Sequence, residues 1–153
     1  MRLTQWTDYA LRVLMHCASC QDRAEPVTIT EIADRYAISR SHLTKIVQFL
    51  GAQQLLETTR GRGGGIRLMR AANAINIGAV VRATETDFVL VECFDPASNA
   101  CCLSPSCKLK GVLQQAMQSY FAVLDGVTLA DLAGPPAKSV LVALPPTRRK
   151  LLV

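Results

Sequence analysis

The chain has 153 residues, of which 50% are hydrophobic, and its formal net charge is +5 at pH 7. This length and composition suffice for one domain with a real core plus an additional element, so general disorder is excluded. There is no run of 18 or more apolar residues and no signal-peptide pattern at the start, so we expect a cytoplasmic protein without a membrane span.

The positive charge is distributed unevenly. The last 20 residues contain four basic and no acidic residues, whereas the other 133 contain 13 basic and 12 acidic residues. Between residues 35 and 70, seven basic residues accompany a single acid, Glu57. A phosphate backbone would be attracted by this local excess, so the segment is a candidate for binding nucleic acid.

The first predicted helix follows Thr4, a residue type that caps helices. Its apolar residues recur at the spacing of one buried face: Trp6, Tyr9, Ala10, Val13, Leu14 and Cys17. Asp8 and Arg12 lie off this stripe, one helical turn apart.

Two short helices joined by a tight turn are predicted next. Thr28 and Glu31 have the spacing of a capping box for the first of them, and Ser39 caps the second. The second helix buries Leu43, Ile46, Val47 and Leu50 and turns Arg40, Ser41, Thr44 and Lys45 outward. These side chains would face the major groove of DNA, where they can bond base edges or phosphates. His42 fits a phosphate contact and a half-buried packing role about equally well.

A basic hairpin is predicted directly after these helices. Residues 55–60 and 66–69 can form two strands around a turn that contains four glycines. Arg60 and Arg62 would reach the minor groove or flanking phosphates. Two packed core helices are common, but a helix-turn-helix followed by such a wing is more specific and favours double-stranded DNA as the partner.

The remaining elements extend beyond a winged helix. Residues 75–85 read as a short helix, about 106–124 as a long amphipathic helix, and 128–132 as a capped short one. The long helix is apolar over a broad face, and a second copy of itself is the economical partner, so we expect a homodimer. The fold class is therefore mainly α with a small β wing: a winged helix-turn-helix plus a long C-terminal dimerisation helix. We divide the chain into a DNA-binding domain (1–85), a cysteine loop (86–105), the dimerisation region (106–133) and a flexible basic tail (134–153).

Four of the six cysteines fall in the loop and its immediate continuation: Cys93, Cys101, Cys102 and Cys107. Without an export signal, clustered cysteines indicate metal or redox chemistry more often than disulfides. Neither the paired CxxC motifs of zinc sites nor the cysteine spacing of ferredoxins is present, so the residues alone do not decide between zinc and an iron–sulfur cluster. Cys17 and Cys20 are expected to fill the core of the first helix.

Several segments resemble the winged-helix regulator family to which IscR and NsrR belong, over about residues 1–133. They are MRLTQWTDYALRVL, ISRSHLTKIVQFL, TRGRGGGIRL and TLADL. TDYALR near the start and the CxLSPSCxLK segment at residues 101–110 are similar to the pattern of the nitric oxide-sensing branch. The resemblance implies an iron–sulfur cluster, [2Fe-2S] or [4Fe-4S], bound by Cys93, Cys101 and Cys107, with Cys102 as the alternative to Cys101. It also implies Asp8 of the partner subunit as a fourth ligand, nitric oxide as the signal and operator DNA as the target of a repressor.

Three rival interpretations differ in kind. A regulator of the same fold would instead sense cluster supply or redox state, as IscR does. A zinc-stabilised DNA-binding protein would have no sensing role. An enzyme is the least favoured, because we find no nucleophile–base pair, phosphate loop or paired carboxylates in the sequence.

Overall fold

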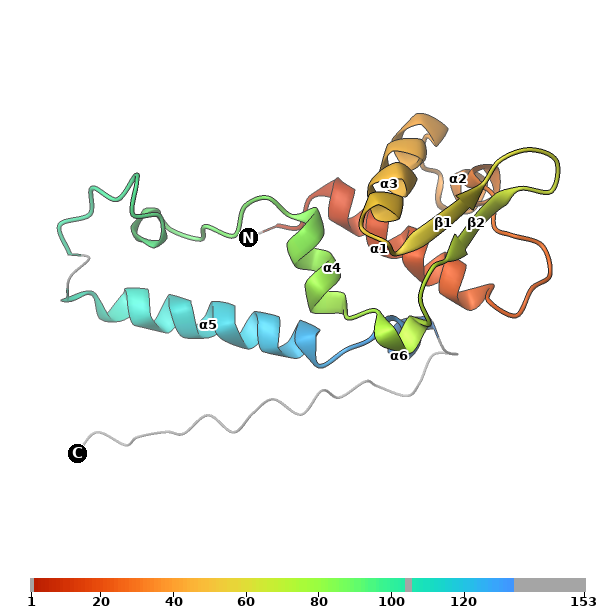
Figure 1. Cartoon of the computed structure of the whole chain (residues 1–153). Helices are drawn as coiled ribbons and strands as arrows, with labels where there is room; N and C mark the ends of the chain where they lie inside the picture. Colours follow the sequence, from red (N-terminus) through yellow and green to blue (C-terminus); the bar gives the residue numbers. More distant parts are fainter. Residues whose placement is uncertain (1, 104–105, 134–153) are drawn as a thin grey trace.

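The structure is a computed structural model that describes residues 2–103 and 106–133. The expected tail, 134–153, lies outside the described residues. The elements, in chain order, are α1 (Gln5–Ser19), α2 (Ile29–Tyr36), α3 (Arg40–Ala52), β1 (Leu56–Thr59), β2 (Gly65–Leu68), η1 (Ala72–Ala74), α4 (Ile77–Thr84), η2 (Glu92–Phe94), α5 (Lys108–Asp125) and α6 (Leu129–Ala133). Figure 1 shows a compact body built from α1–α4, the hairpin and α6, from which α5 and the cysteine loop extend as an arm.

Helix α1 is the centre of the body and contacts α3, α4, α6 and β2. Most of its predicted apolar stripe is buried, with Val13 and Leu14 fully inaccessible, whereas Trp6 and Tyr9 are only partly buried. The predicted cap is present, because the Thr4 hydroxyl accepts a hydrogen bond of 3.3 Å from the Thr7 amide.

The helix-turn-helix consists of α2 and α3. Ala37 ends α2 in the left-handed conformation, with φ of 54°, and this reverses the chain within three residues. The Ser39 hydroxyl then caps α3 by accepting from the His42 amide at 3.3 Å. At the start of α2, the Thr28 hydroxyl accepts from the Glu31 amide at 3.1 Å. The Glu31 carboxylate does not complete the capping box, because it binds the charged Arg23 instead.

The wing is the antiparallel pair β1–β2, in which Leu56 lies opposite Leu68 and Thr59 opposite Gly65. Its tight tip depends on glycine at position 64, where a Cβ atom would collide with the Thr59 carbonyl. Ile66 also exchanges two backbone hydrogen bonds with Val27, of 2.7 and 3.1 Å. The segment before α2 is thereby joined to the wing by backbone hydrogen bonds.

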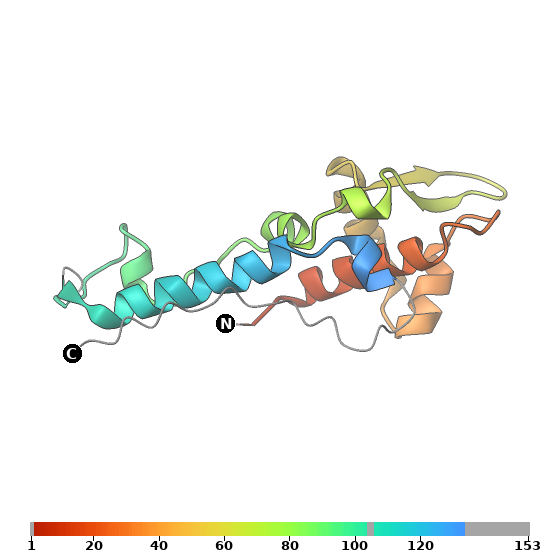
Figure 2. The same cartoon turned by 90° about the horizontal axis from the view of Figure 1, so that it is seen from below.

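The arm leaves the body at α4 and returns to it at α6 (Figure 2). The C-terminal half of α5 packs on α4, where the Arg82 guanidinium binds both Asp125 carboxylate oxygens at 2.6 and 2.7 Å. Phe121 packs edge-on against Phe88, with ring centroids 4.9 Å apart. Leu129 of α6 is fully buried and its amide donates to the Ile75 carbonyl at 2.8 Å. The chain after α5 therefore completes the core of the winged-helix body.

Candidate nucleic-acid interface and cysteine loop

The outward face of α3 has the side chains expected to read DNA. Arg40, Ser41 and Lys45 are exposed, and Thr44 is half-buried. The Thr44 hydroxyl donates to the Arg40 carbonyl at 2.8 Å, so its proton is used within the helix while its oxygen can still accept. The buried stripe on the opposite face holds these residues toward solvent.

The wing forms the second half of this surface. Arg60 and Arg62 are exposed at its tip, beside Gly61 and Gly63, which both have positive φ. A hollow lined by the start of α2, the outer side of α3 and the hairpin separates the wing from the recognition helix. Helix and wing thus offer exposed basic side chains on both sides of this hollow, an arrangement of the type that binds a duplex.

Two residues of the basic segment are occupied within the protein. Arg67 donates to the backbone carbonyls of Arg23 and Ala24, so its guanidinium is held against the loop before α2. The His42 ring packs against Trp6 and Tyr9, at centroid distances of 6.1 and 5.3 Å. The structure therefore supplies a packing role for His42, the second of the two that the sequence allowed.

The loop cysteines are free thiols on the arm. Cys93 lies in η2 and Cys107 is the N-cap of α5, both half-buried, whereas Cys101 and Cys102 are exposed. The backbone between them is shaped by short polar turns, such as the Asn99 side chain accepting from the Cys101 amide at 3.1 Å. Cys93 also lines a hollow between the loop and the outer half of α5. The described part of the chain places no three loop thiols within 4.8 Å of one another.

Asp8 lies on the winged-helix body and not on the arm. It is half-exposed on the first turn of α1 and forms an ion pair of 2.8 Å with Arg12. A carboxylate at the N-terminal end of α1 is also stabilised by the helix dipole. Within one subunit, Asp8 therefore already has a structural partner.

The start of α1 is fastened to the end of α4. Glu85 accepts hydrogen bonds from the Thr4 amide at 2.7 Å and from the Thr4 hydroxyl at 3.1 Å. Burial opposes ionisation of this carboxyl, but hydrogen bonds from Thr7 and Thr4 outweigh burial and lower its pKa. The cysteine loop begins at the next residue, so it starts from a fixed point beside α1.

Comparison with known proteins decides the family. Residues 3–135 match the model of the Rrf2 family, described as iron-dependent transcriptional regulators. The HTH-type transcriptional regulators NsrR of Bacillus subtilis and Bacillus licheniformis are both 52% identical to this chain over 132 residues. That alignment covers 86% of this chain and 90% and 92% of those two proteins. The chain belongs to the Rrf2 family.

Solved Rrf2 regulators share the fold. Oxidised CymR of Staphylococcus aureus superposes with a TM-score of 0.70 at 24% identity, covering 88% of this chain and 98% of CymR. IscR of T. potens superposes with a TM-score of 0.68 at 23% identity, covering 86% of this chain and 85% of IscR. The predicted family and the predicted winged-helix fold class are thus confirmed, and the chain is a transcriptional regulator of the NsrR type.

Among the residues that the structure describes, no helix combines the length and hydrophobicity needed to cross a lipid bilayer.

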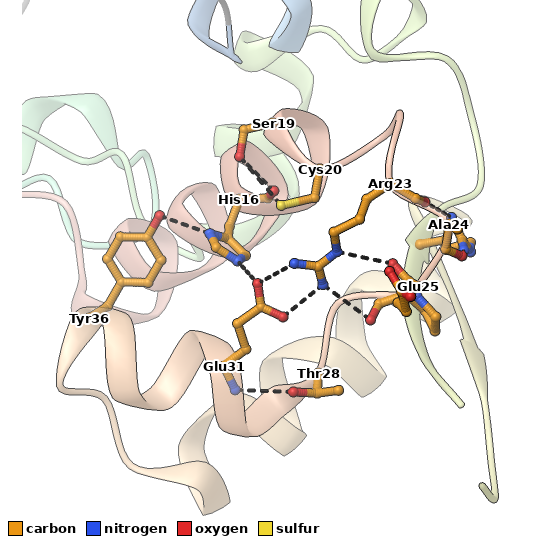
Figure 3. Close-up of polar contacts among 11 residues, drawn as sticks. His16, Ser19, Cys20, Arg23, Ala24, Glu25, Thr28, Glu31 and Tyr36 are labelled. Atoms are coloured by element: carbon orange, nitrogen blue, oxygen red, sulfur yellow. Dashed lines mark hydrogen bonds and ion pairs between the residues drawn. The ribbon is translucent and has the colours of Figure 1, made fainter. Parts of the chain in front are cut away.

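Sequence reasoning missed a polar cluster between α1 and α2 (Figure 3). It assigned Cys20 to core filling and gave no role to His16, which is 4% exposed. In the structure His16, Cys20 and Glu31 lie together, with Arg23 bound to Glu31. The one available signal was the four-residue spacing of His16 and Cys20, which places both on one helix face.

Proposed function

We propose that this Rrf2 protein is a cytoplasmic, homodimeric, nitric oxide-sensitive repressor whose affinity for operator DNA is controlled by an iron–sulfur cluster. The observation that carries the proposal is the position of three free thiols, Cys93, Cys101 and Cys107, on a helical arm that extends from a winged-helix body. The family description, iron-dependent transcriptional regulator, agrees with it.

The donor set fits such a cluster. Cysteine thiolates are the ligands that iron–sulfur clusters use, and both [2Fe-2S] and [4Fe-4S] forms are compatible with these residues. The first turn of α5 has no side-chain cap, so its free amide groups favour negative charge at Cys107. Asp8 of the partner subunit is the proposed fourth ligand, and Cys102 is the alternative to Cys101.

The DNA-binding half of the proposal rests on α3 and the wing. Arg40, Ser41, Thr44 and Lys45 enter the major groove, and Arg60 and Arg62 contact the minor groove or flanking phosphates. A dimer presents two such units, so its operator contains two half-sites about one or more helical turns apart.

The geometry also suggests how the two halves are coupled. When bound, the cluster supplies an iron whose weakly held oxygen ligand leaves it open to nitric oxide. Asp8 lies on α1, which packs directly against the recognition helix α3, while the thiols belong to the arm. A ligand set shared between subunits ties the arm of one to α1 of the other, and losing this tie changes the spacing of the recognition helices.

Anaerobic native mass spectrometry tests the proposed ligands, because it reports the dimer and its iron and sulfide content together. We expect a dimer with one cluster per chain, loss of the cluster in Cys93→Ala, Cys107→Ala and Cys101→Ala, and retention in the adjacent control Cys102→Ala. Full iron and sulfide content in Cys93→Ala and Cys107→Ala would contradict the proposal. Zinc in place of iron would support the zinc-stabilised rival, and operator affinity that follows cluster loading but ignores nitric oxide would support the IscR-type one.

A further inference from the structure

The polar cluster between α1 and α2 has no part in the proposed DNA interface or in the cysteine loop. His16 lies near the end of α1, Cys20 is the C-cap of that helix, and Glu31 is in the first turn of α2. One donor atom from each of the three lies within 4.8 Å of the other two. Figure 3 shows all three pointing into the space between the helices. Nitrogen, sulfur and carboxylate oxygen donors from two helices are thus gathered at one point.

His16 is held as metal-binding histidines are held. Its ring is 4% exposed, with Nδ1 3.4 Å from the Tyr36 hydroxyl and Nε2 3.1 Å from Glu31 Oε1. In the metal-free chain Nε2–H donates to the ionised Glu31 carboxylate. Moving that proton to Nδ1, where the ring donates to the Tyr36 hydroxyl instead, frees the Nε2 lone pair for a cation at the Glu31 side. A partner at one ring nitrogen that orients the other is the arrangement that supports metal ligation.

A cation already occupies the mouth of this cluster. The Arg23 guanidinium lies 2.9 Å from one Glu31 carboxylate oxygen and 2.8 Å from the other. Hydrogen bonding from Arg23 lowers the pKa of Glu31 to about 2, so the carboxylate is charged throughout the physiological range. The Arg23 side chain is 38% exposed and lies on the loop between α1 and α2. It can therefore withdraw into water if another cation takes its place.

We propose that His16, Cys20 and Glu31 form a binding site for a divalent cation of the zinc class, with Arg23 in the position of that cation in the metal-free chain. Histidine, cysteine and carboxylate are the donors that zinc uses, and the thiol and imidazole disfavour magnesium and calcium. Three protein ligands leave a fourth position for water. Binding forms a metal–thiolate bond and releases the thiol proton of Cys20 to solvent, so affinity rises with pH. The bound cation joins the scaffold helix α1 to the first helix of the DNA-binding motif.

Cobalt(II) is the probe, because its thiolate complexes absorb in the near ultraviolet. The test uses the full chain with Cys93, Cys101, Cys102 and Cys107 replaced by serine, so that the loop thiols do not contribute. None of these four belongs to the buried core, and circular dichroism checks the fold. We expect one cobalt per chain, a thiolate band, and displacement by zinc.

Cys20→Ala and Cys20→Ser should abolish the thiolate band and weaken binding by tenfold or more. Cys17→Ala is the matched control, one turn earlier on the same helix. Burial raises the pKa of that thiol to about 12, and its sulfur is not one of the three gathered donors, so the band should persist. Serine at position 20 keeps the size of the side chain, and this separates loss of a ligand from loss of folding.

Arg23→Gln removes the competing cation and should tighten cobalt binding about two- to fivefold, the range that a partly exposed ion pair provides. Absence of stoichiometric cobalt binding would overturn the proposal. So would a thiolate band that survives in both Cys20 variants, or an Arg23→Gln affinity no higher than that of the parent. The DNA-binding proposal does not depend on any of these results.

Discussion

Leu109, in the first turn of α5, provides a quantitative test of dimerisation through the arm. Its side chain is 62% exposed, and Val112, three residues on, is 60% exposed. Side chains this apolar at the i, i+3 spacing form a stripe that a second α5 would cover. The contribution of Leu109 to such an interface can be worked out from the area that remains open.

Leu109→Ala removes three carbon groups, worth about 0.8 kcal/mol each, or about 2.4 kcal/mol when all are buried. Because 62% of the residue is exposed and can be covered by the partner, Leu109→Ala removes about 1.5 kcal/mol of association free energy per subunit. A twofold interface contains the residue twice, so the dimer loses about 3 kcal/mol. This corresponds to a roughly 150-fold rise in the dimer dissociation constant.

Sedimentation equilibrium across a range of concentrations measures this constant. Met69→Ala is the matched control, since Met69 is 49% exposed but lies just after β2, away from α5. We expect the control to dimerise like the parent. A Leu109→Ala constant within twofold of the parent value would refute the reasoning and place the dimer interface elsewhere.

Two further predictions concern charge. Lys45→Ala should weaken binding to all DNA sequences and reduce the slope of log affinity against log salt concentration by about 0.9. Arg67→Ala is the control and should leave the slope unchanged, because the Arg67 guanidinium binds backbone carbonyls. Equal slopes for the parent and Lys45→Ala in salt titrations would contradict this. For Glu31, hydrogen bonding from Arg23 lowers the pKa from 4.5 to about 2 in the folded chain, so its stabilisation is present above about pH 4.5 and is lost as pH falls toward 2. That difference is worth at most about 3.4 kcal/mol, and about 1 to 2 kcal/mol once solvent screening of the part-exposed pair is included. In urea unfolding with a chelator present, the free energy of unfolding of Glu31→Gln should therefore be lower than that of the parent at pH 6 and approach it near pH 2.5. A constant difference in the free energy of unfolding across that range would show that the ion pair does not contribute.

Local signals in the sequence were sufficient for most of the body. The caps at Thr4, Thr28 and Ser39, the buried stripe of α3 and the glycine-rich wing all act over a few residues, and each forms where its pattern indicated. The long helix was expected from about residue 106 to 124 and spans Lys108–Asp125. Helix ends fray, so a difference of one or two residues at each end is ordinary.

Contacts between distant segments were not readable from the chain. The Val27–Ile66 bridge, the burial of Leu129 in the winged-helix core and the Glu85–Thr4 link join residues 39 to 81 positions apart. A periodic pattern specifies which face of an element is buried but not which neighbour buries it. The half-formed capping box at α2 has a similar cause. The Glu31 carboxylate binds the Arg23 guanidinium from the preceding loop, so it does not bind the start of its own helix.

The cysteine loop was predictable from the sequence only in part. Its composition identified free thiols in a loop, and the structure places Cys93, Cys101 and Cys107 on the arm with Asp8 on the body. One subunit does not gather the three thiols, which is expected if a cluster and a second subunit order the loop. The presence of free thiols in this loop was therefore predictable, whereas the geometry of a shared site depends on the cluster and on the second subunit.

Operator affinity before and after exposure to nitric oxide tests the central claim most directly. The anaerobically purified holoprotein, with its iron and sulfide content measured, is titrated against operator DNA, treated with stoichiometric nitric oxide, and titrated again at the same salt concentration. The account predicts that affinity falls by tenfold or more on treatment, and that the cluster-free Cys93→Ala protein binds weakly and does not respond. Unchanged affinity of the treated holoprotein would contradict it.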